Sequence, residues 1–570
     1  MGELLRRAVR LSLPVAALAL AAGCGGGGAS STPSSGGAAA GTPQTGGTLT
    51  ILASSAFGVA DPAQNYTLQE WQLLIDTHDG LVQFKRVGGT QGTQLVPDLA
   101  ESIPQPTDGG KTYTFQIRKG IKFSNGQVVK PSDFVTTFER QFTVPGPTSF
   151  YSGIVGADQC KPSHCDLSKG VVADDSSYTL TIHLTAPDPE FLDKLALPFA
   201  YVVPGNTSPK LTGNKVPPGT GPYMWKSYDP NKELVLVRNP NFKVWNPDAQ
   251  PPGYPDQIVE KFGLQVSDEV TQVENGQADE VFDGDTIPSD RLNEIATQYA
   301  SQVHVNALTA DWYFALNTKT KPFNNLKARQ AINYAFDREA AVKLAGGPSL
   351  AVPTCQVLPP NFPGYVQYCP YTKDPAPNGA GPWKGPDIPK AKQLVQQSGT
   401  AGMNVVVNTD GPDKPFGEQM VTDLNKIGYH ASLKVLQGSI QYPFVQNSTN
   451  LDKWQVAWSA WYQDYPAASD FLNVLLGCGS IHPHSDASPN IAEFCDKGIQ
   501  AKMDQAEAKG GTDPDAANQI WAQVDHDVTD QAPWVDMYNP KQIDFLSKRV
   551  QGYQWNPQWY ILIDQMWLKQ

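Results

Sequence analysis

Alternating apolar and polar positions predict strands at several places along the chain. Within Thr112–Arg118, residues Tyr113, Phe115 and Ile117 fall on one face and polar residues on the other, which is the pattern of a half-buried strand. The same pattern and similar apolar runs predict strands over Thr48–Ala53, Tyr178–Leu184, Glu233–Asn239 and Ala431–Gln437.

Apolar residues at helical spacing lie between these strands. Pro131 opens a predicted helix in which Phe134, Phe138 and Phe142 share one face. Further helices are predicted over Leu326–Leu344, over Lys390–Ser398 before Gly399, and around Met420–Ile427 before Gly428. Because strands and helices interleave, the predicted fold class is α/β.

The N-terminus has the three-part plan of a secretory signal peptide. Arg6, Arg7 and Arg10 precede the apolar run Leu11–Ala22, and small residues follow it. The segment Leu-Ala-Ala-Gly-Cys ending at Cys24 resembles the bacterial lipobox, with Ala21 where that motif has a larger apolar residue. We expect a lipoprotein signal peptide over 1–23 and lipidation of Cys24. Ordinary secretion with cleavage nearby, or twin-arginine export, is the alternative.

Residues 24–47 are predicted to be a flexible linker. From Gly25 to Gly47 every residue except Gln44 is Gly, Ala, Ser, Thr or Pro, a composition that cannot bury a core. A coil of this length extends over roughly 25–30 Å. The linker would therefore hold a folded body just above a membrane surface, and no later apolar run is long enough to span one.

The rest of the chain, from Thr48 to Gln570, is too long for one ordinary core and predicts two or more lobes. A formal net charge of -13 argues against a nucleic-acid partner, because binding phosphates requires a basic surface.

Seven cysteines are present, and six remain once Cys24 is assigned to the lipid. They fall into three pairs that are close in sequence: Cys160 with Cys165, Cys355 with Cys369, and Cys478 with Cys495. An even number in an exported protein predicts disulfides. The alternative is a zinc site, because Cys478, His482, His484 and Cys495 form a ligand set that zinc accepts.

No catalytic motif stands out. The "GGKT" segment at Gly109–Thr112 imitates the end of a phosphate-binding loop but lacks its first glycine, and we interpret it as a turn. Nucleophile-elbow and zinc-protease motifs are missing from the sequence. We therefore expect a protein that is not an enzyme and has neither cofactor nor metal, with a secreted hydrolase as the weaker alternative.

Several blocks resemble, in order, the large peptide-binding family of extracellular solute-binding proteins of ABC transporters, which includes dipeptide and oligopeptide receptors. The blocks are "LVPDLAES" from Leu95, "GGKTYTFQIRKGIKFSNGQVVKPSDFVTTFER" from Gly109, "GTGPYMWKSYDPNKELVLVRNPNF" from Gly219, "ENGQADEVFDG", "FALNTKTKPFNNLKARQAINYAFDRE" and "WYQDYPAASDFL". The resemblance runs from about Thr48 nearly to the C-terminus.

This resemblance implies a two-lobed periplasmic-binding-protein clamshell of class II type. Lobe one would comprise 48–304 plus 536–570, with an additional subdomain near 80–190, and lobe two would comprise 305–535. The implied function is a monomeric receptor, anchored by lipid at the outer face of the bacterial cytoplasmic membrane. It would capture peptides between its lobes and deliver them to an ABC permease that is driven by a cytoplasmic ATPase.

The resemblance also implies ligand-binding residues. In peptide-binding members, a Trp-x-x-Asp step ahead of a Phe-Leu helix places an aspartate against the α-amino group of the ligand. The step matches Trp461, Tyr462 and Asp464 here. Trp312 and Asn317 are further cleft candidates, with core packing as the alternative.

An oligosaccharide, nickel chelate or opine is the alternative ligand. Ala467 and Ala468 stand where many relatives have acidic and proline residues, so the loop after Asp464 differs from theirs. Trp454 and Trp458 are either core residues or part of a surface on which sugars stack.

Overall fold

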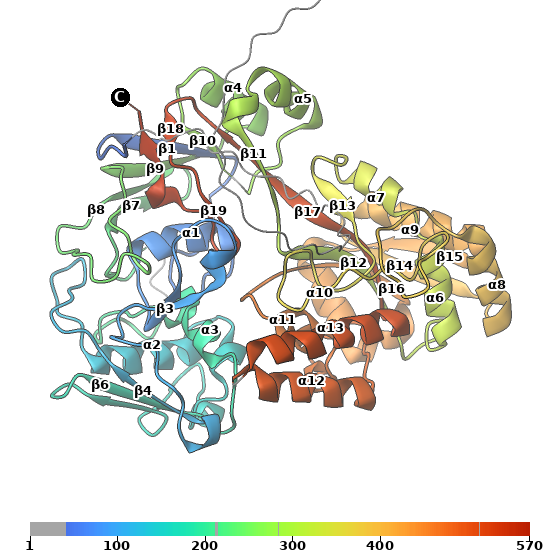
Figure 1. Cartoon of the computed structure of the whole chain (residues 1–570), viewed down its shortest axis with the longest axis horizontal. Coiled ribbons are helices and arrows are strands. Elements are labelled where there is room, and N and C mark those ends of the chain that lie inside the picture. Colours follow the sequence, from blue (N-terminus) through green and yellow to red (C-terminus); the bar gives the residue numbers. More distant parts are fainter. Residues whose placement is uncertain (1–41, 57, 211–214, 283, 512, 570) are drawn as a thin grey trace, which may run out of the picture. The chain divides into compact units, whose positions relative to one another are not determined.

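One long strand near the C-terminus, β17 (Trp534–Leu546), connects the two halves of a 12-stranded sheet. Its first residues pair antiparallel with β12 (Ala310–Leu316) and β13 (Ala351–Pro353), and its last residues pair with β10 (Glu280–Val281) and β11 (Val303–Ala307). The computed structural model describes residues 42–56, 58–210, 215–282, 284–511 and 513–569, which belong to one folded unit (Figure 1).

The first half of the sheet forms the first lobe. Beyond β17 its order is β10, β1 (Thr48–Ala53), β9 (Gln257–Phe262), β8 (Glu233–Arg238) and β7 (Tyr223–Asp229). Successive residues of β1 point to opposite faces. Leu52 packs with α4 (Val266–Glu274) and α5 (Ser289–Gln298), whereas Ile51 packs with Leu73 of α1 (Leu68–Thr77) and with C-terminal residues.

A smaller sheet belongs to the same lobe. Its order is β4 (Thr112–Gln116), β6 (Thr179–His183) and β5 (Val171–Asp174), all antiparallel. Helices α2 (Pro131–Thr143) and α3 (Phe191–Leu195) pack against it, together with the β2–β3 pair (Val82–Phe84 and Leu95–Pro97). Tyr113, Phe115 and Ile117 are buried in this core, as their alternation predicts.

The second half of the sheet forms the second lobe, in the order β12, β16 (Val456–Tyr462), β14 (Asn404–Thr409) and β15 (His430–Val435). Helices cover both faces, so alternate residues of β12 enter different cores. Phe314 packs against α6 (Leu326–Ala335), α7 (Arg338–Leu344), α8 (Ile388–Ser398) and α9 (Lys414–Ile427). Tyr313 packs against α11 (Ser469–Leu476), α12 (Lys497–Gly510) and α13 (Pro514–Gln531), and α10 (Gly438–Gln446) lies at the edge of this core.

Most predicted elements are confirmed, with one correction. The single helix predicted over Leu326–Leu344 is wrong, because the structure has α6 and α7 with a break at Phe336–Asp337. The side chain of Asp337 accepts a hydrogen bond from the backbone N–H of Ala340 and starts a new helix there. Gly399 and Gly428 end α8 and α9 in the left-handed conformation that glycine adopts without strain.

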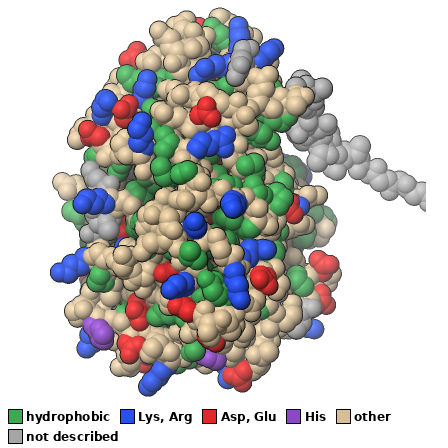
Figure 2. Space-filling view, turned by 90° about the vertical axis from the view of Figure 1, so that its left-hand side faces the viewer, with side chains coloured by type: hydrophobic (Ala, Val, Ile, Leu, Met, Phe, Trp, Pro, Cys, Tyr) green, Lys and Arg blue, Asp and Glu red, His purple; other side chains and the backbone are tan. Residues whose placement is uncertain are grey.

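The predicted α/β fold of two lobes is confirmed. In the part of the chain that the structure describes, no helix is both long enough and apolar enough to cross a membrane. Figure 2 shows one face of the molecule, on which Lys and Arg side chains are interspersed with acidic and apolar ones.

Candidate ligand-binding cleft

The loop that follows β16 carries Asp464. The backbone N–H of Gln463 still pairs with the carbonyl of Thr309, after which the chain leaves the sheet and enters α11 at Ser469. The backbone N–H of Asp464 donates a 2.9 Å hydrogen bond to Oδ2 of Asp470, in the first turn of α11. This bond fixes the start of the loop, which we call the Asp464 loop (residues 463–468).

Residues of the first lobe also form hydrogen bonds with the Asp464 loop and the start of α11. The carboxylate of Glu190 accepts hydrogen bonds from the hydroxyls of Tyr465, at 3.2 Å, and Ser469. The side-chain amide of Gln558 donates a 2.8 Å hydrogen bond to the carbonyl of Asp464. The Asp464 loop is therefore positioned by both lobes.

Asp464 is a nearly buried carboxyl group, with 7% of its surface exposed. Its Oδ2 accepts a 2.8 Å hydrogen bond from the hydroxyl of Tyr66, and no Lys or Arg of the described residues pairs with it. Burial raises the pKa of Asp464 to about 7, against a smaller lowering by the Tyr66 hydrogen bond. A buried carboxyl group without a cation favours a positively charged ligand.

A second carboxyl group lies directly beside it. Oδ2 of Asp470 accepts hydrogen bonds from the Asp464 backbone and from the indole N–H of Trp461, but Oδ1 has no hydrogen-bond partner within the described part of the chain. Burial raises the pKa of Asp470 well above its usual value, and the charges of Asp464 and Glu190 raise it further. The end of β16 thus places two carboxyl groups side by side in a poorly hydrated place, where burial disfavours their charged forms.

Asp464 borders a cavity of about 280 Å³, which we call the Asp464 pocket. The first lobe contributes Tyr66, Thr67, Gln69 and Trp71 at the start of α1, and the second lobe contributes Ala460, Trp461, Tyr462, Gln463 and Asp464. The ring of Tyr66 packs against Trp71 and Phe199, although 44% of the Tyr66 surface is exposed. One carboxylate within largely aromatic walls suits a ligand that has one cationic group and apolar parts.

A second cavity of about 290 Å³, the Trp312 pocket, shares Gln69 and Tyr462 with the first. Its walls include Trp312 on β12, Phe416 on α9, and Tyr538 on β17. The first lobe closes it with Gln69 and the segment Gly284–Ile287. The two pockets therefore adjoin each other between the lobes.

The structure brings together four of the five predicted ligand-binding residues. Asp464, Trp461 and Tyr462 line the Asp464 pocket, and Trp312 lines the adjoining one. Asn317 lies elsewhere: it is fully buried, and its amide donates to the carbonyls of Leu451 and Trp454. This position stabilises the backbone before the "PFNN" segment and does not reach the cleft.

Sequence reasoning missed the residues that the first lobe contributes. Tyr66 lies 398 positions from Asp464 in the sequence, and no motif marks it or Gln69. Trp454 and Trp458, which the sequence left open as a sugar-stacking surface, are both buried in the cores around β16.

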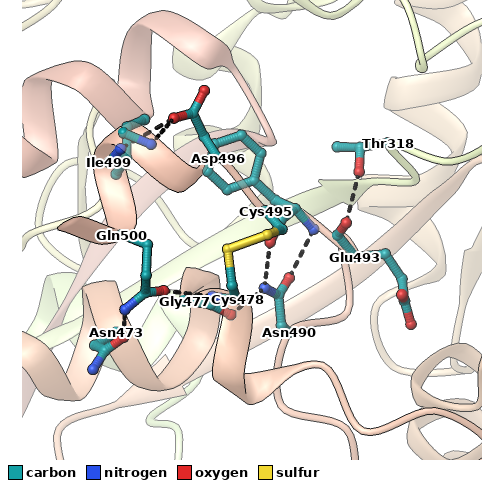
Figure 3. The surroundings of a disulfide bond; sticks show 12 residues. Thr318, Asn473, Gly477, Cys478, Asn490, Glu493, Cys495, Asp496, Ile499 and Gln500 are labelled. Atoms are coloured by element: carbon teal, nitrogen blue, oxygen red, sulfur yellow. Dashed lines mark hydrogen bonds between the residues drawn. A yellow bond between two sulfur atoms is a disulfide. The ribbon is translucent and has the colours of Figure 1, made fainter. Parts of the chain in front are cut away.

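The three pairs of cysteines that are close in sequence form disulfides: Cys160–Cys165, Cys355–Cys369 and Cys478–Cys495. Figure 3 shows the third, which joins the end of α11 to the start of α12 beside the hydrogen-bonded amide of Asn490. Because Cys478 and Cys495 bond to each other, they do not serve as zinc ligands with His482 and His484. Among the described residues no cluster of metal-ligating side chains is found. Cys24 lies outside the described residues.

Comparisons with known proteins show what this chain is similar to. Residues 94–483 match the family model of bacterial extracellular solute-binding proteins, family 5 (middle region). The chain is 25% identical over 532 residues to di/tripeptide-binding protein 1 of Pseudomonas aeruginosa, covering 87% of this chain and 90% of that protein. It is 26% identical over 511 residues to heme-binding protein A of Haemophilus influenzae, covering 84% of each. Among solved structures, clavulanic acid biosynthesis oligopeptide binding protein 2 superimposes with a TM-score of 0.83 at 23% identity, over 93% of this chain and 97% of that one.

Proposed function

Because the chain belongs to the bacterial extracellular solute-binding proteins of family 5, we propose that it is a receptor that captures short peptides in its interlobe cleft and delivers them to an ABC permease. The expectation that it is not an enzyme is confirmed by this family membership. The family places the chain among exported proteins, and lipid anchoring through Cys24 is part of the proposal.

One observation favours peptides as the ligand class. Asp464 is nearly buried, has no cationic partner among the residues that the structure describes, and faces a cavity between the lobes. The α-amino group of a peptide supplies both a positive charge and N–H donors, and a charge-assisted hydrogen bond of this kind is the strongest available to a buried carboxylate. The names of several relatives, including di/tripeptide-binding protein 1, support the same ligand class.

Closure of the lobes is the proposed mechanism of capture. We assign residues 48–304 plus 536–570 to lobe one, with the subdomain near 80–190, and residues 305–535 to lobe two. The chain would cross between lobes at the link from β11 to β12 and within β17, which pairs with strands of both halves. A ligand that contacts both sides of the cleft stabilises the closed state, since its contacts are complete only there.

The proposed location follows from the N-terminal sequence. A lipid on Cys24 and the linker over 24–47 would keep the folded body near its permease, which raises the effective concentration of loaded receptor at the membrane. The oligosaccharide alternative loses its main support, because Trp454 and Trp458 are core residues.

A thermal-shift screen of the purified protein tests this proposal. A ligand that binds only the folded state adds about 2.7 kcal/mol of stability at a hundredfold excess over Kd. We expect di- and tripeptides with a free amine to raise Tm, and the same peptides with an acetylated amine to have little effect. A response to oligosaccharides or chelates alone would keep the fold and overturn the ligand class.

A further inference from the structure

The Trp312 pocket is lined by a continuous row of aromatic rings. The Trp312 ring lies 5.0 Å from the Tyr462 ring in an edge-to-face contact and 5.9 Å from the Tyr538 ring in a stacked one. The Phe416 ring follows at 5.8 Å from Tyr538. Because β16, β12 and β17 are neighbours in the sheet, at about 4.8 Å per strand, the row spans about 10 Å across three strands.

Apolar surface remains exposed in this pocket. Tyr462 is 38% exposed, Leu344 at the end of α7 is 47% exposed, and Trp312 is partly exposed. These side chains come from separate elements and converge on one cavity, unlike scattered exposed apolar residues, which need no explanation. An apolar group that entered the cavity would cover all three.

The charged groups at the rim already have partners within the protein. The ammonium group of Lys541 donates a 2.9 Å hydrogen bond to the carbonyl of Pro348. The carboxylate of Asp285 accepts hydrogen bonds from the backbone N–H and the hydroxyl of Ser54, at 2.6 and 2.5 Å. Most of the residues that line the cavity are apolar or aromatic, and they lie beside these paired charged groups.

The Trp312 pocket adjoins the Asp464 pocket, where we propose that the peptide amine binds. Tyr462 lines both cavities and is two residues before Asp464, and Gln69 lines both from the opposite lobe. A peptide whose amine contacts Asp464 and whose chain passes Tyr462 would bring its next side chain to the row of aromatic rings. A cavity of about 290 Å³ is at the small end of ligand pockets and suits a single large side chain.

We propose that the Trp312 pocket is a specificity subsite that selects peptides with a bulky apolar side chain, aromatic or branched aliphatic, on the residue after the amine-bearing one. This inference rests on the proposed peptide-binding function and adds to it a preference among peptides. The selecting residues are Trp312, Tyr462, Leu344, Phe416 and Tyr538.

Calorimetric titration with two dipeptides tests the subsite. Alanyl-phenylalanine and alanyl-alanine share the amine and the backbone and differ in the second side chain alone. We expect the phenylalanyl peptide to bind about tenfold or more tightly, because one additional apolar group in a fitting pocket commonly changes affinity by about 10–200-fold. Trp312→Ala should remove most of this preference, because it should weaken the binding of alanyl-phenylalanine far more than that of alanyl-alanine.

Two further variants, matched in exposure, test the subsite even if Trp312→Ala does not fold. Leu344 and Ile440 are both 47% exposed, but Ile440 on α10 lines neither pocket. Leu344→Ala should lower the affinity for alanyl-phenylalanine several-fold, and Ile440→Ala should not change it. Equal affinities of the unmodified protein for the two dipeptides, or equal losses for both in Leu344→Ala, would overturn the subsite while leaving the proposed function intact. Absence of binding by either dipeptide would overturn the proposed function and the subsite with it.

Discussion

The hydroxyl of Tyr66, in the first lobe, donates a 2.8 Å hydrogen bond to the carboxyl group of Asp464, in the second. Without a ligand, the buried acid is therefore stabilised by a neutral donor from the opposite side of the cleft. A peptide amine would have to replace or join this donor. The bond links closure of the lobes to the ionisation of the residue that we propose binds the ligand.

The first prediction concerns pH. Asp464 has a pKa of about 7 in the free protein, so below pH 7 it is mostly protonated and cannot pair with an ammonium group. Peptide affinity should fall about tenfold for each pH unit below 7, and binding at pH 6 should release close to one proton. Above about pH 8 the peptide amine loses its own proton. Affinity should therefore be highest between about pH 7 and 8.

Calorimetry in buffers with different heats of ionisation measures the proton release directly. Asp464→Asn should abolish the fall in peptide affinity below pH 7, which we call the low-pH limb of the affinity profile. If wild-type affinity were constant from pH 5.5 to 8, the proposed role of an ionised Asp464 would be wrong.

Tyr66→Phe provides an independent test of the same site. The ring still packs against Trp71 and Phe199, so the fold should be preserved. The Tyr66 hydrogen bond lowers the pKa of Asp464, and its removal should raise that pKa. The midpoint of the low-pH limb should therefore move to higher pH. A midpoint that stays in place, or moves to lower pH, would contradict this assignment.

The sequence predicts local structure well where one periodic pattern decides it. The alternation at Tyr113, Phe115 and Ile117 and the glycine after Ile427 locate β4 and the end of α9, because burial and backbone sterics act over a few residues. The helix predicted over Leu326–Leu344 is broken by a helix cap at Asp337. The apolar stripe does not show this break, because it continues past Asp337. Local pattern alone did not reveal that cap.

The candidate site could be predicted only in part. Asp464 and Trp461 are found because the Trp-x-x-Asp step at the end of β16 resembles a motif of the peptide-binding family, whereas Tyr66 reaches Asp464 through the packing of two lobes. Asn317 was expected near the cleft because it precedes the "PFNN" segment, but its side chain donates hydrogen bonds to backbone carbonyls inside the second lobe. Contacts over hundreds of residues and the direction of one side chain are properties of the tertiary fold.

Glu190 is predicted to act on ligand retention through the Asp464 loop. Glu190→Ala would leave the buried hydroxyls of Tyr465 and Ser469 without their acceptor, at a cost of about 1–3 kcal/mol for an unsatisfied group. We expect peptide affinity to fall about tenfold, mainly through faster dissociation in stopped-flow experiments. Glu101→Ala, at an exposed position, is the control. Unchanged dissociation in Glu190→Ala would show that the loop is held by its other bonds alone.

The disulfides should differ in their contribution to stability. Cys478–Cys495 and Cys355–Cys369 close loops of 17 and 14 residues, and Cys160–Cys165 closes one of 5. Closing a loop of about 15 residues is worth roughly 3 kcal/mol in the chain-entropy model. Replacing either long-loop pair by serine should lower the free energy of unfolding in urea by about 2–4 kcal/mol, and replacing the short-loop pair should lower it less. The reverse order would contradict the entropic explanation.

The variant Cys24→Ala tests whether a lipid on Cys24 anchors the protein to the membrane. If Cys24 carries the lipid, this variant should move from the membrane fraction to the medium and lose the incorporation of labelled fatty acid. Wild-type protein that is released without any label would instead indicate ordinary secretion.

The most direct test of the central claim is the affinity of one dipeptide, with a free and with an acetylated amine, for the wild-type protein and for Asp464→Asn. Asp452→Asn, at an exposed position outside both pockets, serves as the control. Loss of one partner of a buried charge pair costs about 2–5 kcal/mol. The account predicts that acetylation and Asp464→Asn each weaken binding by that amount, and that together they weaken it little further. Equal affinity of Asp464→Asn and wild type for the free-amine peptide would contradict it.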